Sequence, residues 1–286
     1  MAERPQKKGV LYIVATPIGN LGDMTERARQ VLSQVAVIAA EDTRHTGRML
    51  QHFGVDASLL SLHDYNEARR ADDIVRRLAQ GDDVALVSDA GTPLISDPGF
   101  AVAQAALAAG YQVAPIPGAC AAIAALSASG MPTDRFVFEG FLPAKAGARR
   151  DRLSGLLSES RTLIFYEAPH RLSATLKDLV EQFGESRQAV VARELTKQYE
   201  SFYRGALAEL AERAARDADM ARGEIVIVVA GAEVEGSSQS VDMTRLLRAL
   251  LAELPASQAA KVAARATGEK RSVAYELALR LANKRP

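Results

Sequence analysis

Cysteine is almost absent from this sequence of 286 residues, since Cys120 is the single one. One thiol forms no internal disulfide and no paired-cysteine zinc site, which is typical of proteins in a reducing cytoplasm. Residues 1–8 contain no apolar signal core, and no stretch reaches the roughly 18–20 apolar residues that span a membrane. We therefore expect a cytoplasmic protein without a metal centre or a membrane segment.

An excess of charge is also missing, because 35 basic residues balance 35 acidic ones. The chain as a whole therefore has no pull toward nucleic acid or membrane, and any RNA contact must come from a local patch. One basic cluster comprises Lys145, Arg149, Arg150 and Arg152, and residues 255–286 carry seven positive charges against two negative ones. Such clusters bind phosphates or form ordinary solvated helix faces, and the sequence leaves both open.

Several common motifs are absent. The sequence contains no GxGxxG after a strand, no GxxxxGK[ST] and no HExxH. Because these patterns bind dinucleotides, nucleotide phosphates and catalytic zinc, their absence disfavours those classes of enzyme.

Apolar runs and helical patterns alternate through the first part of the chain. We predict strands at 9–15, 35–40, 58–62, 83–88 and 112–116, and helices at 25–34, 44–52, 67–80, 99–109 and 119–129. This alternation predicts an α/β fold with a largely parallel sheet.

The second part predicts a different sheet. Its strands fall at 135–141, 162–168, 188–194, 201–204 and 224–230, and its helices at 147–158, 171–183 and 206–217. Since the strand at 201–204 follows another directly, we expect a mixed or antiparallel sheet. Residues 236–240 have the composition of a linker, and the last 46 residues are helical by pattern. We predict an N-terminal α/β domain (1–117), a C-terminal α/β domain with a mixed sheet (118–235) and a helical extension (236–286).

Two loops rich in glycine and proline follow predicted strands. In residues 14–28, Pro17 and Gly19 allow a sharp turn, and Asp23 with Glu26 predicts a capping box. Residues 88–99 (SDAGTPLISDPG) hold two prolines, two glycines and two aspartates. Ligands of α/β proteins bind at the carboxyl ends of strands, so both loops are candidate binding elements, although the first also fits an ordinary βα turn.

Ionisable residues follow three further predicted strands. Glu41, Asp42 and Arg44 form either an acid/base set or a helix cap with a surface ion pair. Side chains alternate along a strand, so only one of the two carboxylates should face a cleft. Residues 165–171 (FYEAPHR) and 192–197 (ARELTK) also join strands to ionisable side chains.

Taken together, these motifs resemble the tetrapyrrole methylase superfamily over residues 9–231. The sequence has Ala15, Pro17 and Ile18 where that superfamily usually has glycines or a GPG proline, and Gly91-Thr92-Pro93 in place of Gly-Asp-Pro. These differences resemble the branch that methylates ribosomal RNA, whose hallmarks are similar to residues 15–21, 40–44, 88–93, 165–171 and 193–197.

The resemblance implies two α/β domains with S-adenosylmethionine in the cleft between them, and a homodimer. Carried over residue by residue, it implies the following cofactor-binding set: Pro17, Ile18, Ala90, Gly91, Thr92, Ile95, Cys120, Ala121, Glu167, Ala168 and Leu195.

The implied reaction is methylation of a cytidine ribose 2′-hydroxyl in 16S ribosomal RNA, within the small ribosomal subunit. The superfamily's candidate base aligns with Glu41, or with Asp42 if the register slips by one, and Arg44 would hold a phosphate or orient the carboxylate. Glu167, Glu194 and Lys197 are the alternative bases. Two other functions stay open: a precorrin-type tetrapyrrole C-methyltransferase, and an RNA-binding protein with a relic cofactor cleft.

Overall fold

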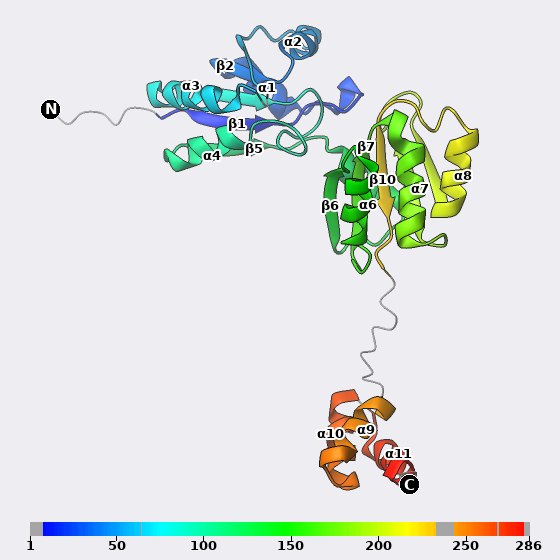
Figure 1. The fold of residues 1–286 in the computed structure, drawn as a ribbon. Coiled ribbons are helices and arrows are strands. Elements are labelled where there is room, and N and C mark those ends of the chain that lie inside the picture. The colour runs from blue at the N-terminus through cyan, green and yellow to red at the C-terminus, as the bar shows by residue number, and fades with distance from the viewer. Residues whose placement is uncertain (1–7, 64, 233–242, 268, 283–286) are drawn as a thin grey trace, which may run out of the picture. The chain divides into compact units, whose positions relative to one another are not determined.

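The chain forms two compact units in a computed structural model of the protein, residues 1–231 and 232–286. The structure describes residues 8–63, 65–232, 243–267 and 269–282. The first unit contains two five-stranded sheets (Figure 1). Both sheets thus fall in one unit, and the boundary expected at residue 117 stays a prediction.

The first sheet is parallel throughout, as predicted. Its strands are β1 (Val10–Val14), β2 (Val37–Ala40), β3 (Leu59–Ser61), β4 (Val84–Val87) and β5 (Gln112–Ile116). Their order is β3-β2-β4-β1-β5. The helices are α1 (Glu26–Gln34), α2 (Thr43–His52), α3 (Glu67–Gln80) and α4 (Phe100–Ala108).

Helices cover both faces of this sheet (Figure 1). The helices α3 and α4 pack on one face, in the apolar cluster that contains Leu78 and Val102. The helices α1 and α2 pack on the other, in the cluster that contains Leu32 and Leu50. Every residue of β2 and β4 is buried, as expected for parallel strands covered on both sides. The loops after these strands therefore emerge together at one edge of the sheet.

The predicted capping box at Asp23 and Glu26 is wrong. Asp23 ends a short 3-10 turn (Leu21–Asp23), in which the N–H of Gly22 donates to the Asn20 side chain (2.9 Å). The cap of α1 is Thr25, whose Oγ1 accepts a hydrogen bond of 3.1 Å from the N–H of Ala28. The 3-10 turn places Asp23 two residues before the cap at Thr25, so Asp23 is too early to cap α1.

The second sheet is mixed, as predicted. Its strands are β6 (Phe136–Phe141), β7 (Thr162–Glu167), β8 (Gln188–Arg193), β9 (Ser201–Ala206) and β10 (Ile225–Val229), in the order β6-β7-β10-β8-β9. The β6–β7 pair is parallel, and the other three pairs are antiparallel.

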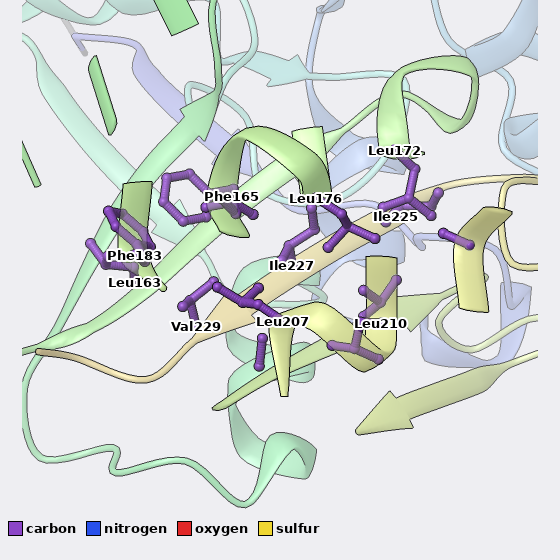
Figure 2. Packing of buried hydrophobic residues seen from close by; sticks show 14 of the residues in the cluster. Leu163, Phe165, Leu172, Leu176, Phe183, Leu207, Leu210, Ile225, Ile227 and Val229 are labelled. Carbon is purple, nitrogen blue, oxygen red and sulfur yellow. The ribbon is translucent and has the colours of Figure 1, made fainter. Parts of the chain in front are cut away.

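Its two faces are covered by different helices, namely α5 (Ala121–Ser129) on one and α6 (Ala146–Ser154), α7 (Leu172–Phe183) and α8 (Leu207–Arg216) on the other. Figure 2 shows Phe165 of β7 and Ile227 of β10 packed against Leu176 of α7 in the larger core. The helix predicted to reach residue 158 ends at Ser154, and residues 155–158 form turns.

The second unit consists of α9 (Met243–Glu253), α10 (Ala256–Thr267) and α11 (Arg271–Ala282), which confirms the helical pattern. Buried alanines, among them Ala260, Ala263 and Ala274, let the three helices approach closely. The predicted linker at 236–240 lies outside the described residues. In the part that the structure describes, no helix is both long and apolar enough to span a membrane.

Candidate functional site

A cavity of about 410 Å³ lies in the first unit, lined by loops at strand ends of both sheets. Its volume is in the range of small-molecule and cofactor sites. The first sheet contributes the loops after β1, β2, β4 and β5, and the second sheet contributes residues after β7 and β8 and the start of β10.

Three of these loops are tied together by hydrogen bonds. The N–H of Thr16 donates to the carbonyl of Gly91 (2.8 Å), and the N–H of Gly91 donates back to the carbonyl of Thr16 (3.1 Å). The Thr92 hydroxyl donates to the carbonyl of Ala119 (3.0 Å). The loops after β1, β4 and β5 therefore form one connected wall of the cavity.

The loop after β4 has an unusual backbone. Gly91 has φ +83°, and a Cβ built there would lie 3.2 Å from Ile18 Cγ2 and 3.7 Å from the Ala119 carbonyl oxygen. Leu94 and Ser96 also have positive φ, at 71° and 68°. Left-handed backbone at non-glycine residues costs free energy and occurs preferentially at functional sites. This loop therefore has the strain typical of a ligand-binding segment.

Glu167, at the end of β7 in the second sheet, lines the cavity. Its carboxylate binds neighbouring groups in the turn after β7 and in α7. It accepts hydrogen bonds from the N–H of Ala168 (2.8 Å) and the hydroxyl of Thr175, and it pairs with Arg171 (3.1 Å). Glu167 is 2% exposed. Its carboxylate therefore holds the turn after β7 in place and is poorly placed to act as a base.

Tyr166 lies beside it at the cavity wall. Its hydroxyl oxygen accepts a hydrogen bond from the N–H of Ala122 (3.2 Å), and its ring contacts Phe138 and Phe141 edge-on. Burial, followed by the neighbouring Cys120, raises the pKa of Tyr166. Tyr166 therefore stays neutral at physiological pH.

Lys197 joins the second sheet to the loop after β1. Its Nζ pairs with Glu194 (2.9 Å) and Glu224 (3.2 Å), and its aliphatic stem lies against Gly19, where a Cβ would overlap it. Burial disfavours the charged ammonium, but the hydrogen bonds to Glu194 and Glu224 outweigh this effect and raise the pKa of Lys197. Lys197 is therefore a poor proton acceptor.

The structure brings most of the predicted site residues together. Of the residues carried over from the resemblance, those that line the cavity are Ile18, Glu41, Ala90, Gly91, Thr92, Ile95, Cys120, Ala121, Glu167, Ala168 and Leu195. Pro17, Asp42 and Arg44 do not line it.

Asp42 caps a helix. Its Oδ1 accepts hydrogen bonds from the N–H groups of Arg44 (2.8 Å) and His45 (3.4 Å) at the start of α2, and its carboxylate pairs with the Arg44 guanidinium (3.1 Å). Hydrogen bonds from the Arg44 side chain and backbone lower the pKa of Asp42 to about 2. A carboxylate with so low a pKa is a weak proton acceptor, and Asp42 does not line the cavity. Its neighbour Glu41 does line it.

Several residues that line the cavity were not predicted as site residues, among them the acidic Asp89 and Asp97. Asp89 accepts a hydrogen bond from the N–H of Asp42 (2.9 Å), and burial together with the charges of Glu41 and Asp89 raises the pKa of Asp97 to about 6. Both belong to the loop 88–99 that the sequence marked as a binding element. The signal was their occurrence in a loop after a buried strand, where we interpreted them only as turn formers.

Two members of the basic cluster around α6, Arg149 and Arg152, are held by acidic partners, whereas the sequence left open phosphate binding and a solvated helix face. Arg149 is 4% exposed, and its Nε donates to Asp178 (2.6 Å) in the core beneath the helix. Arg152 pairs with Glu139. The sequence could not show this, because the partner of Arg149 lies 29 residues away in α7.

A parallel α/β sheet, a mixed second sheet and a cavity at their strand ends define a known class. The family model for Tetrapyrrole (Corrin/Porphyrin) Methylases matches residues 10–211, and the chain belongs to this family. A second model, the RsmI C-terminal HTH domain, matches residues 237–282.

Within the family, the chain is similar to two proteins named ribosomal RNA small subunit methyltransferase I. The protein of Pseudomonas aeruginosa is 52% identical over 95% of this chain and 97% of its own length. The protein of Escherichia coli O157:H7 is 51% identical over 95% of each.

Solved structures of the family share the fold at lower identity. Uroporphyrin-III C-methyl transferase from Thermus thermophilus, in a complex with S-adenyl homocysteine, matches with a TM-score of 0.54 and 18% identity. The match covers 78% of this chain and 97% of that one. This similarity supports the fold alone.

Proposed function

We propose that the protein transfers a methyl group from S-adenosylmethionine to a cytidine ribose 2′-hydroxyl of 16S ribosomal RNA. The observation that carries the proposal is the cavity at the strand ends, in a chain 52% identical over 95% of its length to a named ribosomal RNA methyltransferase. The identity extends through the helical unit, which the second family model also matches.

The cavity residues fit this cofactor. Gly91 has no side chain where a Cβ would crowd Ile18, so backbone and ligand can approach closely. Apolar side chains at Ile18, Ile95 and Leu195 offer surfaces to the adenosine part. When bound, the cofactor supplies a methyl group on a positively charged sulfonium. The remaining residues that would hold it are Ala90, Thr92, Cys120, Ala121 and Ala168.

The protein's own contribution to the chemistry is alignment and proton acceptance. Holding donor and acceptor in line removes most of the entropic barrier of a bimolecular transfer. A ribose hydroxyl is a weak nucleophile and must lose its proton. Glu41 lines the cavity, and its carboxylate would accept that proton.

The helical unit supports an RNA substrate. Lys261, Arg265, Lys270 and Arg271 are exposed on and between α10 and α11, and a surface of this kind neutralises phosphates. We expect this substrate to be methylated in the cytoplasm, within the small ribosomal subunit.

The alternative function, a precorrin-type tetrapyrrole methyltransferase, is not favoured. The relatives that share 52% and 51% of their residues with this chain are named ribosomal RNA small subunit methyltransferase I. The test is transfer of tritium from labelled S-adenosylmethionine to small ribosomal subunits, followed by nuclease mapping of the labelled nucleotide. Label in a 2′-O-methylcytidine supports the proposal. Label in a porphyrinogen offered in parallel, with none in RNA, contradicts it.

We further propose a homodimer. Phe100 and Leu107 lie seven residues apart on α4, hence on one face, and are 67% and 61% exposed. A second copy of the chain would cover them. Sedimentation should give a dimer for the wild type and a monomer for Phe100→Ser/Leu107→Ser; a wild-type monomer contradicts this.

A further inference from the structure

Phe141 is an exposed aromatic residue at the rim of the cavity. It lies at the end of β6, lines the cavity and is 53% exposed. Ile18 and Leu195, which also line the cavity, are only 5% and 7% exposed. Single exposed apolar residues are common on protein surfaces, so exposure alone assigns no role to this ring. Its placement is more informative, because an irregularity of β6 produces it.

A one-residue bulge in β6 turns Phe141 toward the cavity. The pairing of β6 with β7 shifts between Phe138 and Gly140, which leaves Glu139 as an extra residue. Side chains alternate along a regular strand, so without the bulge Phe138 and Phe141 would point to opposite faces. With it, both rings contact Tyr166 edge-on, with centroids 4.9 Å and 5.6 Å from that of Tyr166. Bulges next to active sites re-aim side chains in this way.

Contacts with two other elements hold this bulge. The Glu139 carboxylate accepts a hydrogen bond of 2.8 Å from Arg152 Nε on α6, and the Glu139 side chain is 6% exposed. Gly140 has φ +65°, and a Cβ built there would lie 3.1 Å from Ser96 Oγ. Ser96 belongs to the loop after β4 and lines the cavity from the first sheet. The bulge therefore packs against the opposite side of the cavity, and the ring beside it has a fixed position.

The Phe141 ring leaves an aromatic surface open. It meets the Tyr166 ring at 64°, so the two rings are not stacked face to face. The Tyr166 hydroxyl accepts the N–H of Ala122 (3.2 Å), which fixes the supporting ring. Proteins bind unpaired RNA bases by stacking them on aromatic side chains of this kind.

We propose that the base of the acceptor nucleotide stacks on Phe141 when its ribose enters the cavity. The inference rests on the proposed function for the nature of the substrate. The acceptor oxygen must come within about 3–3.5 Å of the methyl carbon, so its nucleotide must be splayed out of the RNA. Stacking on Phe141 replaces contacts that the base loses and fixes the ribose beside the cofactor. Since every base has an aromatic face, this contact binds the nucleotide without selecting cytidine.

The test measures kcat/KM for methylation of small ribosomal subunits, and the dissociation constant of S-adenosylmethionine by calorimetry. Phe141→Ala should lower kcat/KM roughly tenfold to a hundredfold, as is typical when a base loses its aromatic partner, and should leave cofactor affinity within about twofold of the wild type. Phe136→Ala is the matched control and should change neither quantity. Phe136 lies at the start of the same strand, is 39% exposed and does not line the cavity.

Two further variants separate stacking from simple apolar cover. Phe141→Tyr keeps the aromatic face and should keep kcat/KM near the wild-type value. Phe141→Leu keeps an apolar side chain on Tyr166 without an aromatic face, and it should lose almost as much as Phe141→Ala. Thermal melting checks that each variant is folded. If Phe141→Ala is unstable, the comparison of Phe141→Tyr with Phe141→Leu carries the test alone.

The outcomes separate the two proposals. If the wild type transfers no methyl group to ribosomal RNA, the proposed function fails, and the inference fails with it. If the wild type is active and Phe141→Leu methylates as well as Phe141→Tyr, the stacking is wrong while the proposed function stands. Equal losses of cofactor affinity and kcat/KM in Phe141→Ala would place the ring against the cofactor and also overturn the stacking.

Discussion

Among single residues, Glu41 and Asp42 are adjacent in the sequence but lie in different environments. Glu41 lines the cavity, whereas Asp42 caps α2 and pairs with Arg44. We expect Glu41→Gln to lower single-turnover methylation by roughly a hundredfold or more, as is typical when a general base is lost. Binding of RNA should change little.

Asp42→Asn is the matched control, because asparagine caps helices about as well as aspartate. It should methylate at a rate near that of the wild type. Near-normal rates in both amide variants would contradict a base at this position.

Gly91 provides a second residue-scale prediction. Gly91→Ala should weaken S-adenosylmethionine at least tenfold, because the new methyl group would stand 3.2 Å from Ile18 beside the cavity. The backbone strain at φ +83° should cost about 1–2 kcal/mol of stability.

Gly110→Ala separates the two effects. Gly110 has φ +77° and nothing within 4 Å of a Cβ, and it does not line the cavity. It should lose similar stability by thermal melting and keep its affinity by calorimetry. Equal affinities in the two variants would show that Gly91 is only a turn residue.

Site residues could be predicted where they belong to a recognisable sequence motif. They could not be predicted where the backbone conformation of a loop determines which side chains reach the cavity. Glu41 follows a predicted strand, Gly91 and Leu195 were implied by the resemblance to the family, and all three line the cavity. Asp97 was missed because its direction depends on the left-handed Leu94 and Ser96. No composition rule predicts positive φ at leucine or serine.

Among the elements, α6 contains a buried ion pair that the sequence presents as part of a surface. Arg149 and Asp178 have side chains 5% and 8% exposed. Arg149→Met should lower the free energy of unfolding by about 3 kcal/mol, because it removes one of the two ion pairs that the described residues make with the buried Asp178 and leaves Arg150, at 3.6 Å. Urea denaturation followed by circular dichroism measures this.

The double variant Arg149→Met/Asp178→Leu should recover most of that stability, since removing both charges also removes the desolvation cost. Lys145→Met, an exposed change at the start of the same helix, should stay within about 0.5 kcal/mol of wild type. A stable Arg149→Met protein would contradict the structural role.

The elements themselves were largely predictable, because apolar runs and helical periodicity are local. The parallel first sheet and the mixed second sheet are both confirmed. The predicted helix at 25–34 agrees closely with α1, but its cap was misplaced at Asp23 because the 3-10 turn before the helix has no periodic signature. The position of β10 between β7 and β8 depends on contacts between residues far apart in the sequence, and local sequence patterns do not predict such contacts.

For the whole molecule, the helical unit and the first unit should contribute separately to binding. Lys261 and Arg265 lie one turn apart on α10 and are exposed. Lys261→Ala/Arg265→Ala should weaken RNA binding and reduce the slope of log affinity against log salt by about 0.7–0.9 per lost phosphate contact. Cofactor affinity should be unchanged.

Lys177→Ala/Arg216→Ala, an equal change of charge on exposed positions of α7 and α8, is the control. It should keep the wild-type salt slope. If the α10 variant keeps the wild-type slope of log affinity against log salt, Lys261 and Arg265 do not contact RNA phosphates and serve only the folding of the helical unit.

The position of β1 within its sheet has a consequence for synthesis on the ribosome. Among the described strands β1 is made first, but its partners are β4 and β5, and Val14 pairs with Ile116. At about 5–20 residues per second, roughly 5–20 seconds of translation separate the two strands. During that interval the apolar segment Val10–Val14 has no native partner on one side, so the nascent N-terminus is a natural client for a chaperone.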